Sequence, residues 1–535
     1  MSTKKKLLLG SAGAAAAGGG ATLDVDEVFS TFLYEGNNTF GPHTITNGID
    51  LSGEDGLVWI KSRDSASSHG LYDTERGATK YLQSNATSAE ATVSLGLTSF
   101  NSNGFNVDYS HYADSHVSWT FRKAEKFFDI VTWSGNGSNR DISHNLGSEP
   151  GMIWIKKRSG SGDWVVYHKF MNGGTNANQY YLQLNEANAQ IGDGSTFNNT
   201  SPTPTVFTIG THNDVNQSGE TYVAYLFADN TNDGEFGPDS DQNIIKCGSY
   251  DADGTTDGSN EITLGFEPQF IFLKRYDSGG YYSQIIDNAR GMVSGGNDSL
   301  IWSNVSGAEV TSINSVDVTA TGFSVNDSGN SNLNNSNWIY MAIRRGPLAA
   351  PTDATKVFSV NEGGTGDNPT NVWNTGFSPD FNINTKTDGS ATYLINRLTN
   401  KYLHAHDAAA EQSASSVKWF TGPSETLNLN TNWWGVGSNV ISYSWKRAPG
   451  YFDVVTYTGT GSARTVAHNL GVAPEMMWVK CRSAATNWGV YTGDNTDYMI
   501  LSANSASQDN ANFWNDTSPT SSVFTLGSEN DINKV

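Results

Sequence analysis

Internal repetition constrains the fold of this chain more than any other feature of its sequence. Phe128–Gly135 matches Phe452–Gly459 almost residue for residue, and His144–Gly147 matches His468–Gly471 at the same offset along the chain. The same offset aligns the residues that follow: Pro150 with Pro474, Trp154 with Trp478, Lys156 with Lys480, and Arg158 with Arg482. Chance does not produce such a series, so the chain consists of related units.

Weaker copies of the pattern fill the rest of the chain. Trp59–Arg63 repeats the series Trp-apolar-Lys-x-Arg, and Pro268–Lys274 keeps the spacing from the proline to the lysine. We predict about five units of about 100 residues each. They are called units 1 to 5, and they follow an Ala- and Gly-rich flexible arm over 1–24: 25–123, 127–228, 243–346, 356–447 and 451–535. Motifs shared by units 1 and 4, and by units 2 and 5, indicate a duplicated two-unit cassette with an extra unit between the copies.

Apolar residues inside the units recur with a period of two, which is typical of β-strands. Within Thr221–Phe227, for example, Val223, Tyr225 and Phe227 share one face. Each such run is short and is bounded by Gly, Asn, Asp or Pro, the residues that hairpin turns require. We therefore predict an all-β chain, a tandem array of β-sandwich, jelly-roll-like units, each holding itself together, arranged as a rod.

Unit 5 lacks a segment that unit 2 contains. Asn530–Asn533 matches Asn213–Asn216, after which unit 2 continues into the predicted strand Tyr222–Phe227. No counterpart of that strand precedes Val535. One interpretation is a truncated sequence, and the other is that a different chain donates the missing strand at an exposed sheet edge.

Charge and composition argue against several classes of function. The formal net charge is −22 and no basic stripe is present, so we expect no nucleic-acid binding. No apolar run is long enough for a transmembrane helix, so we expect no membrane insertion. Residues 4–20 imitate a signal peptide with a weak apolar core; a flexible arm is preferred and a cleaved signal is the alternative. Cys247 and Cys481 are predicted to be free thiols.

The repeated charged residues favour structural roles over catalysis. Asp129 and Asp453 each follow a core phenylalanine, and we predict that they are solvent-facing acids on a strand. The series Asp-x-x-Arg at Asp73–Arg76 and Asp287–Arg290 predicts ion pairs that hold a loop. A glycosidase would instead need two carboxylates across a glycosidic bond, repeated with the units.

One histidine recurs in the repeat, as His144 and His468, directly before Asn-Leu-Gly. A single histidine per unit suits a loop hydrogen bond better than a metal site. No nucleophile elbow, phosphate loop or zinc motif is recognisable. The sequence therefore predicts no catalytic residue, and we expect that the protein is not an enzyme.

Two kinds of ligand remain open. Asp229, Thr231 and Asp233 alternate as in a calcium loop, but Ser240 occupies the twelfth place, where an EF-hand has glutamate; the alternative is a solvated linker between units. Calcium is thus the only cofactor considered. Exposed aromatic rings stack on sugars, and the candidates for carbohydrate binding, with core packing as the alternative, are Tyr281, Tyr282, Trp433 and Trp434.

The motifs together resemble an uncharacterised repeat domain of structural proteins from marine tailed phages. The resemblance covers the chain from about residue 24 and is strongest in units 2 and 5. The residues that carry it are Phe452–Gly459, Thr465–Gly471, Pro474–Lys480, Asn487 and Trp488, Ser518–Thr520, and Tyr222–Ala228. It implies a virion protein, labelled as a tail fibre or minor structural protein, and no established catalytic residues.

We therefore expect a non-enzymatic structural protein of the phage virion, in a tail fibre or another surface appendage, with a role in host attachment. Its expected partners are other virion proteins, further copies of itself and a glycan of the host surface. The first alternative is a secreted or cell-surface lectin-like adhesin, which a cleaved N-terminus would favour. The second is a polysaccharide depolymerase, which would release reducing sugars from the host envelope.

Overall fold

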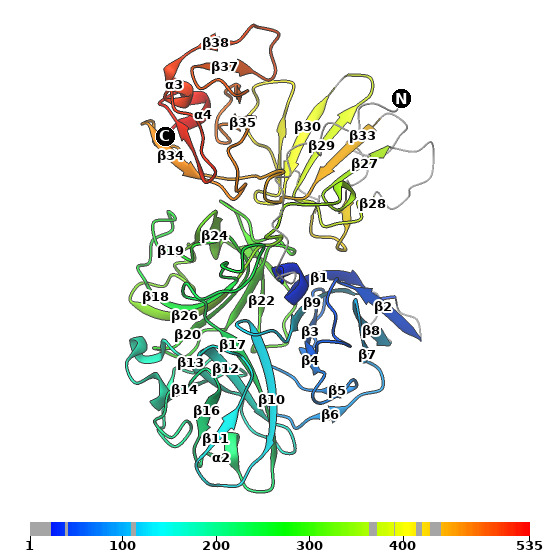
Figure 1. Cartoon of the computed structure of the whole chain (residues 1–535), viewed down its shortest axis with the longest axis vertical. Helices are drawn as coiled ribbons and strands as arrows, with labels where there is room; N and C mark the ends of the chain where they lie inside the picture. Colours follow the sequence, from blue (N-terminus) through cyan, green and yellow to red (C-terminus); the bar gives the residue numbers. More distant parts are fainter. Residues whose placement is uncertain are drawn as a thin grey trace.

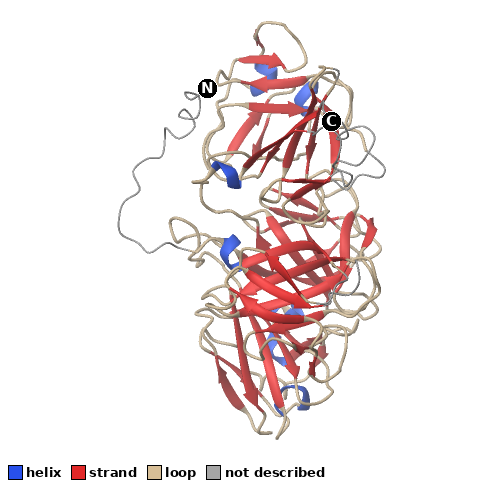
Figure 2. Ribbon diagram, turned by 90° about the vertical axis from the view of Figure 1, so that its right-hand side faces the viewer, coloured by secondary structure: helices blue, strands red, loops and turns tan. Residues whose placement is uncertain are grey.

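The structure, a computed structural model, describes residues 23–37, 41–108, 114–362, 372–389, 391–413, 420–428 and 440–535. Strands dominate these residues (Figures 1 and 2), and the helices among them are single turns. The prediction of an all-β fold is confirmed. Nearly all of the predicted arm over 1–24 lies outside the described residues. No helix in the described part of the chain is long and apolar enough to cross a membrane.

Units 1 and 2 each contain a larger and a smaller antiparallel sheet, with strand orders β1-β9-β3-β4 and β2-β8-β7 in unit 1, and β10-β17-β12-β13-β14-β15 and β11-β16 in unit 2. The elements of unit 1 are α1 Val25–Val28, β1 Phe29–Glu35, β2 Pro42–Thr46, β3 Gly56–Ser62, β4 Gly70–Asp73, β5 Lys80–Tyr81, β6 Ala91–Thr92, β7 Leu97–Asn101, β8 Gly104–Asp108 and β9 Ser115–Arg122. Those of unit 2 are β10 Phe128–Ser134, β11 Arg140–Ser143, β12 Pro150–Lys157, β13 Val165–His168, η1 Met171–Gly174, η2 Ala177–Gln179, β14 Tyr180–Gln183, β15 Ile191–Gly192, β16 Val206–Ile209, α2 Asn213–Asn216 and β17 Thr221–Ala228.

Units 3 and 4 repeat this arrangement, with larger sheets β18-β26-β20-β21-β22-β23 and β27-β33-β29-β30-β31 and smaller sheets β19-β25-β24 and β28-β32. The strands of unit 3 are β18 Ile245–Ala252, β19 Glu261–Thr263, β20 Pro268–Arg275, β21 Gln284–Asp287, β22 Asp298–Trp302, β23 Val310–Ile313, β24 Val316–Thr319, β25 Gly322–Val325 and β26 Ser336–Arg344. The elements of unit 4 are η3 Ala354–Lys356, β27 Phe358–Glu362, β28 Val372–Asn374, β29 Phe381–Lys386, β30 Thr392–Asn396, β31 Lys401–His404, β32 Thr426–Asn428 and β33 Val440–Trp445.

Unit 5 has the sheets β35-β36-β37-β38 and β34-β39. Its elements are β34 Arg464–Ala467, β35 Met477–Lys480, β36 Trp488–Tyr491, β37 Asp497–Ile500, β38 Gln508–Asp509, α3 Ala511–Trp514, β39 Val523–Leu526 and α4 Asn530–Asn533. These strands correspond to β11–β16 of unit 2, so the larger sheet of unit 5 begins at the counterpart of β12.

In units 1 to 4, the last long strand is an interior strand of the larger sheet, second in the strand order. In units 1 to 4 these strands are β9, β17, β26 and β33, and each pairs antiparallel on both sides, with the first strand of its unit and with the strand that carries the Trp-apolar-Lys series or its counterpart. Seven of the eight residues of Thr221–Ala228 are buried. A strand with two buried faces needs apolar residues on both, which explains why these runs are so rich in aromatic side chains.

Units 1, 2 and 3 surround one common hydrophobic core (Figure 1, lower half). Trp59 and Trp154 hold equivalent positions in units 1 and 2, and their ring centroids lie 5.5 Å apart. Trp154 lies 5.7 Å from Phe272, the equivalent residue of unit 3. The expected rod of self-contained units is therefore wrong for this part of the chain, because the larger sheets bury their aromatic faces against one another.

Three equivalent backbone hydrogen bonds close these units into a ring, here called the first ring. The Glu90 N–H of unit 1 donates to the Arg158 carbonyl of unit 2 over 2.8 Å, and the Gln190 N–H donates to the Tyr276 carbonyl of unit 3 over 2.8 Å. The Glu309 N–H of unit 3 then donates to the Arg63 carbonyl of unit 1, also over 2.8 Å. Each unit thus presents the same loop to the same strand end of the next unit.

Units 4 and 5, in the upper half of Figure 1, meet through the same contact. The Glu411 N–H donates to the Arg482 carbonyl over 2.9 Å, and the Arg482 guanidinium binds the Glu411 carboxylate over 2.9 Å. Arg158 with Glu90 and Arg63 with Glu309 form the matching ion pairs of the first ring. Unit 4 is therefore related to unit 5 as unit 1 is to unit 2.

Candidate functional site: buried charges between the units

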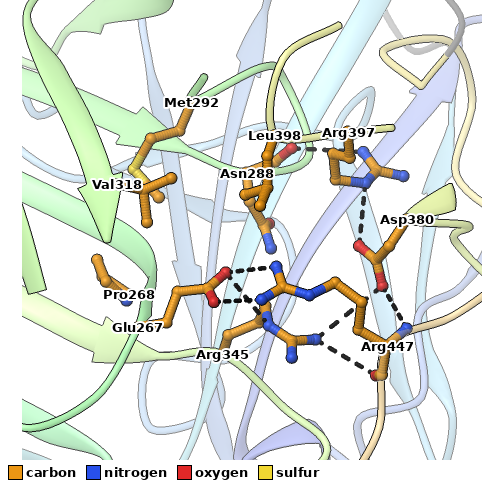
Figure 3. Close-up of a pocket in the computed structure, with 10 residues that line it drawn as sticks. All are labelled: Glu267, Pro268, Asn288, Met292, Val318, Arg345, Asp380, Arg397, Leu398 and Arg447. Atoms are coloured by element: carbon orange, nitrogen blue, oxygen red, sulfur yellow. Dashed lines mark hydrogen bonds and ion pairs between the residues drawn. The ribbon is translucent and has the colours of Figure 1, made fainter. Parts of the chain in front are cut away.

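A network of buried charged side chains lies where units 3, 4 and 5 meet (Figure 3). Arg447, the last residue of unit 4, donates through both terminal nitrogens to the Glu267 carboxylate of unit 3, over 2.7 Å from Nη1 to Oε1. Its Nε donates to Asp453 of unit 5 over 2.7 Å, and its backbone N–H donates to Asp380 over 2.8 Å. A single guanidinium therefore connects three units.

Two further arginines balance the charge of the three acids. Arg345 Nε lies 3.4 Å from Glu267, and Arg397 Nε lies 3.4 Å from Asp380. The cavity left among these side chains has a volume of about 10 Å³, no more than one water molecule needs. The network is therefore filled by its own partners and leaves no space for a substrate.

The pKa values of the network fix its charges. Burial acts to lower the pKa of Arg447, but the carboxylates of Glu267 and Asp453 outweigh it and raise that pKa. Burial acts to raise the pKa of Asp453, but Arg447 and Arg345 outweigh it and lower that pKa. Both groups stay charged across the physiological range, so this pair cannot exchange protons as an acid–base couple must.

The predicted ion pairs Asp73–Arg76 and Asp287–Arg290 are confirmed, and both are fully buried. The structure adds a role that the sequence does not reveal, because each pair contacts the next unit of the first ring. Asp73 accepts a hydrogen bond from the Tyr225 hydroxyl of unit 2 over 2.6 Å. Asp287 accepts one from the indole N–H of Trp119 in unit 1, over 3.0 Å.

Unit 2 carries a histidine, His168, at the position of these two aspartates. Its Nε2 lies 3.1 Å from the Tyr340 carbonyl of unit 3, and burial lowers its pKa to about 3, so the neutral ring donates. Together with the Asp73–Tyr225 and Asp287–Trp119 contacts, this bond completes a second set of three contacts around the first ring. This position of the repeat therefore makes a contact between units in all three units of the first ring, whether an aspartate or a histidine occupies it.

The prediction that Asp129 and Asp453 face solvent is wrong, because both side chains are buried. Each accepts a hydrogen bond from the backbone of the His-Asn-Leu-Gly loop, from the Asn145 N–H over 2.7 Å and from the Asn469 N–H over 2.8 Å. Each also pairs with the last basic residue of the preceding unit; Lys123 lies 3.5 Å from Asp129. The loop lies over the start of the segments that begin at Phe128 and Phe452. The second residue of each segment is therefore covered from solvent, although strand periodicity alone predicts that its side chain is exposed.

The histidines of the loop behave as predicted. His144 Nε2 lies 3.1 Å from the Thr203 carbonyl, and His468 Nε2 lies 3.2 Å from the Thr520 carbonyl. The other ring nitrogen of His144 accepts from the Leu146 N–H over 3.2 Å. Both ring nitrogens are therefore used in holding the loop against the Ser-Pro-Thr turn.

The calcium candidates are engaged in contacts within the protein. Asp229 is buried, pairs with Lys169 at 2.5 Å and accepts from the Cys247 N–H over 2.9 Å. Asp233 accepts from the Thr231 N–H over 2.8 Å. These bonds account for both carboxylates, and a calcium ion at this loop stays a prediction. The alternative of a solvated linker between units is wrong for Asp229, which is buried, whereas Thr231 and Asp233 are exposed.

A different group of side chains has the composition of a metal site. His404, His406 and Asp407 are the only such group of three among the described residues, with ligand atoms within 4.8 Å of one another. His404 Nδ1 lies 2.8 Å from the Asp407 carboxylate, and His406 Nδ1 lies 3.0 Å from the Thr392 carbonyl. The cluster is half exposed at the end of β31. The signal His-x-His-Asp is visible in the sequence of unit 4, but the other units lack it, so the repeated residues do not point to it.

The carbohydrate candidates divide into two groups. Tyr281 is partly buried, under the Arg275 guanidinium at 4.5 Å and beside Trp338. Tyr282 is 45% exposed, with its ring centroid 5.7 Å from that of Trp302. Trp433 and Trp434 lie outside the described residues. Tyr282 is thus the candidate that the structure leaves open to a ligand.

The lysine of the repeated series Trp-apolar-Lys is also buried. Lys156 donates to the Thr87 carbonyl of unit 1 over 3.0 Å and to the Gly162 carbonyl over 2.7 Å. Lys274 donates to the Glu186 carbonyl of unit 2 over 2.8 Å. Burial lowers the pKa of Lys156 to about 8 and that of Lys274 to about 7. These lysines hold the loop of the preceding unit in the ring.

Both cysteines are free, as predicted, and Cys247 is buried. Burial, and the nearby Asp229 carboxylate, raise the pKa of the Cys247 thiol well above its usual range. A protonated buried thiol is a poor nucleophile and a poor metal ligand. Cys247 therefore acts as an apolar side chain in the core.

Comparison with known proteins gives a family without an assigned function. No curated protein matches the sequence. A domain of unknown function, DUF7483, matches residues 24–347 and again residues 353–535. The first match extends over units 1 to 3, the three units of the first ring, and the second extends over units 4 and 5. Because these two matches cover almost the whole sequence, the chain belongs to the DUF7483 family.

Proposed function

We propose that the protein is a structural component of a phage virion, in a tail fibre or another surface appendage, and that it takes part in host attachment. The main support is the closed first ring, in which three units contact one another through equivalent backbone bonds and ion pairs. The repeated acids Asp73 and Asp287, predicted to form ion pairs that hold a loop, also accept hydrogen bonds from neighbouring units. Such an arrangement produces a rigid scaffold that carries loops on its outside.

The shared core supports a role outside a cell. Unfolding one unit of the first ring exposes the aromatic faces of the other two units to water. Local opening therefore costs the free energy of burial of several large side chains at once. Proteins that open rarely resist proteases. The formal net charge of −22 keeps the protein from binding nucleic acids non-specifically. Other virion proteins, further copies and a host glycan are its proposed partners.

Immunogold electron microscopy of phage particles, with an antibody raised against units 2 to 4, tests the proposal. Label on tails or projecting fibres is the expected result. Label on the capsid would support a virion protein, but one that decorates the capsid and is not part of an appendage. Label on cells with bare particles would contradict the proposal and favour a secreted or cell-surface adhesin.

The lectin-like alternative has one observation in its favour, the exposed ring of Tyr282 beside Trp302. A sugar that stacks there would change the tryptophan fluorescence. Titration with host-envelope polysaccharide should then lose its signal in Tyr282→Ala and keep it in Leu95→Ala, which removes an equally exposed apolar side chain elsewhere. Release of reducing sugars in the same mixture would favour a depolymerase.

A further inference from the structure

Unit 4 carries two histidines and an aspartate where units 1 to 3 carry other residues. The strand β31 of unit 4 ends at His404, and His406 and Asp407 follow it closely. The pairing of β31 with β30, and of the corresponding segments in units 1 to 3, aligns these positions across the chain. The position of His406 is held by an asparagine in each of the other three units: Asn85, Asn185 and Asn304.

These asparagines have a structural role, and His406 keeps it. Each asparagine accepts a hydrogen bond from a backbone N–H at the start of the paired strand, over 3.2 Å from His69, 2.8 Å from Trp164 and 3.0 Å from Ser283. His406 Nδ1 accepts the equivalent bond from the Thr392 N–H over 3.2 Å. An asparagine therefore suffices for the fold at this position, and the second ring nitrogen of His406 is an addition that the fold does not need.

This additional nitrogen lies near two other ligand atoms. His406 Nε2 lies 3.7 Å from Asp407 Oδ2, and His404 Nδ1 lies 2.8 Å from the same oxygen. The two imidazole rings are stacked, with centroids 4.9 Å apart and an angle of 13° between their planes. Alternate residues of an extended chain present their side chains on the same face, which explains why the two rings lie side by side. One atom from each of the three side chains thus lies within 4.8 Å of the others.

The separations between these atoms fit a single transition-metal ion. An ion with tetrahedral geometry and bonds of about 2.0–2.1 Å holds its ligand atoms about 3.4 Å apart. The two measured separations, 2.8 Å and 3.7 Å, lie on either side of this value. The side chains of His406 and Asp407 are 37% and 45% exposed, so a small rotation of each brings both atoms to the required distance.

Hydrogen bonds outside the cluster orient two of the ligands. The other carboxylate oxygen of Asp407 accepts from the Ala409 N–H over 2.8 Å. His406 Nδ1 also lies 3.0 Å from the Thr392 carbonyl, to which it donates when Nε2 binds an ion. Histidines and carboxylates that bind metals in proteins are held by outer bonds of this kind. The arrangement therefore has the supporting contacts of a metal site as well as its ligands.

We propose that unit 4 binds one Zn²⁺ ion through His404 Nδ1, His406 Nε2 and a carboxylate oxygen of Asp407. Two imidazoles and one carboxylate are ligands that Zn²⁺ prefers, whereas Ca²⁺ and Mg²⁺ prefer oxygen ligands alone. Water is the fourth ligand, on the exposed side of the cluster. The His404 carbonyl accepts from the Trp488 indole of unit 5 over 2.7 Å, so the ion fixes the end of β31 beside the contact between units 4 and 5.

Titration of the full chain with Zn²⁺ tests the proposal. The chain carries no affinity tag, and Cys481→Ser removes a partly exposed thiol that competes for the ion. A chelator first removes any metal, and calorimetry should then show one Zn²⁺ bound per chain. An equal concentration of Ca²⁺ should not displace it. Co²⁺ bound in place of Zn²⁺ should show the strong visible absorption of a four-coordinate ion, which the hydrated six-coordinate ion lacks.

The repeat itself supplies substitutions that suit the fold. His404→Gln, His406→Asn and Asp407→Ala each introduce the residue that unit 1 has at the equivalent position. Each should weaken zinc binding by at least about 100-fold, because the loss of an outer partner alone costs about 10–100-fold. His406→Asn keeps an acceptor for the Thr392 N–H, so its melting temperature without metal should equal that of the parent chain. Zinc should raise the melting temperature of the parent chain and not that of His406→Asn.

The matched control is His212→Asn in unit 2. His212 Nε2 lies 3.8 Å from the Asp193 carboxylate, and this pair is not part of a group of three ligands in the described residues. Zinc binding should be unchanged in this variant. A parent chain that takes up no Zn²⁺, or uptake that His406→Asn leaves unchanged, would overturn the proposal. So would displacement of the bound Zn²⁺ by an equal concentration of Ca²⁺. None of these results depends on where the protein acts.

Discussion

At the scale of single residues, the sequence repeats charged side chains whose role is to join units. Lys156 and Lys274 are buried with backbone carbonyls as partners, and burial lowers the pKa of both. Arg447 is buried with carboxylate partners, and its pKa is raised. The difference follows from the partners: a carbonyl dipole compensates the loss of hydration less than a full negative charge does. Stability should therefore depend on pH through the lysines.

Lys274 predicts an increase of stability with pH. Its pKa is about 7 in the folded chain and near the ordinary value for lysine when unfolded, so between these values the unfolded chain binds one more proton. The free energy of unfolding should then rise by up to about 1.4 kcal/mol per pH unit above pH 7. Lys274→Met should lower the slope by this amount and leave the slopes that Lys61 and Lys156 contribute, because burial lowers the pKa of each to about 8. Lys356→Met, at an exposed lysine, should keep the wild-type slope. Urea midpoints at pH 7, 8 and 9 measure it, and equal slopes for the wild type and Lys274→Met would refute it.

The buried ion pair Asp73–Arg76 predicts that neutralising one partner strongly lowers the free energy of unfolding. Asp73→Asn leaves the Arg76 charge without its buried partner, which costs about 3–5 kcal/mol of unfolding free energy. Asp287→Asn should cost a similar amount, since Arg290 occupies the equivalent place. Glu235→Gln at the exposed pair with Lys126 should cost less than about 1 kcal/mol. Denaturant unfolding of the variants compares them, and a loss for Asp73→Asn as small as that for Glu235→Gln would show that the pair carries little stability.

At the scale of elements, the central strand of each larger sheet decides how its neighbours are buried. The strands β12 and β35 have closely related sequences, and every residue of β12 is buried, whereas β35 has Trp478 exposed. Propensity and pattern are the same in both segments. The difference lies in the surroundings of the two strands: Trp154 packs against Phe227 of β17, Trp59 of unit 1 and Phe272 of unit 3. Burial of a repeat residue therefore depends on its sheet and on the ring around it, and not on the repeat alone.

The matched tryptophans make this difference measurable. Trp154→Ala removes a fully buried indole and should cost about 3–5 kcal/mol. Trp478→Ala, at the equivalent but exposed position, should cost less than about 1 kcal/mol. Melting temperatures of both variants give the comparison, and equal losses at the two positions would contradict it.

At the scale of the whole molecule, the chain divides by its cores. One large hydrophobic cluster contains residues of units 1, 2 and 3, whereas the clusters inside units 4 and 5 are smaller. A further cluster of unit 3 includes Leu398 of unit 4 and forms a limited apolar contact between the two parts. The network of Arg447, Glu267 and Asp453 connects the two parts through charges. A shared apolar core couples unfolding more strongly than a set of ion pairs does.

Calorimetry should therefore show two transitions, with units 4 and 5 unfolding at the lower temperature and the first ring at the higher one. Trp154→Ala should lower the upper transition alone. Trp488→Ala, which removes the contact of unit 5 with the His404 carbonyl of unit 4, should lower the lower transition alone. A single transition that both variants lower equally would mean that the two parts unfold together.

The sequence by itself determined the local structure. Alternating apolar residues and turn residues specify strands, because side chains on a strand point to opposite faces, and the repeat specifies where equivalent strands recur. The Asp-x-x-Arg pairs were predictable for the same reason, since their partners lie three residues apart along the chain. The burial of Asp129 was not, because the loop that covers it lies 16 residues away.

Tertiary structure alone decided how the units associate. The contact from unit 3 back to unit 1 joins Glu309 to Arg63, which lie 246 residues apart. No local pattern encodes such a contact; it follows from the packing of three aromatic sheet faces that would otherwise face water. The same holds for Arg447, whose sequence neighbours resemble those of Lys123 but whose partner Glu267 comes from unit 3. Repetition thus predicts the units, and the burial of their shared faces determines the ring.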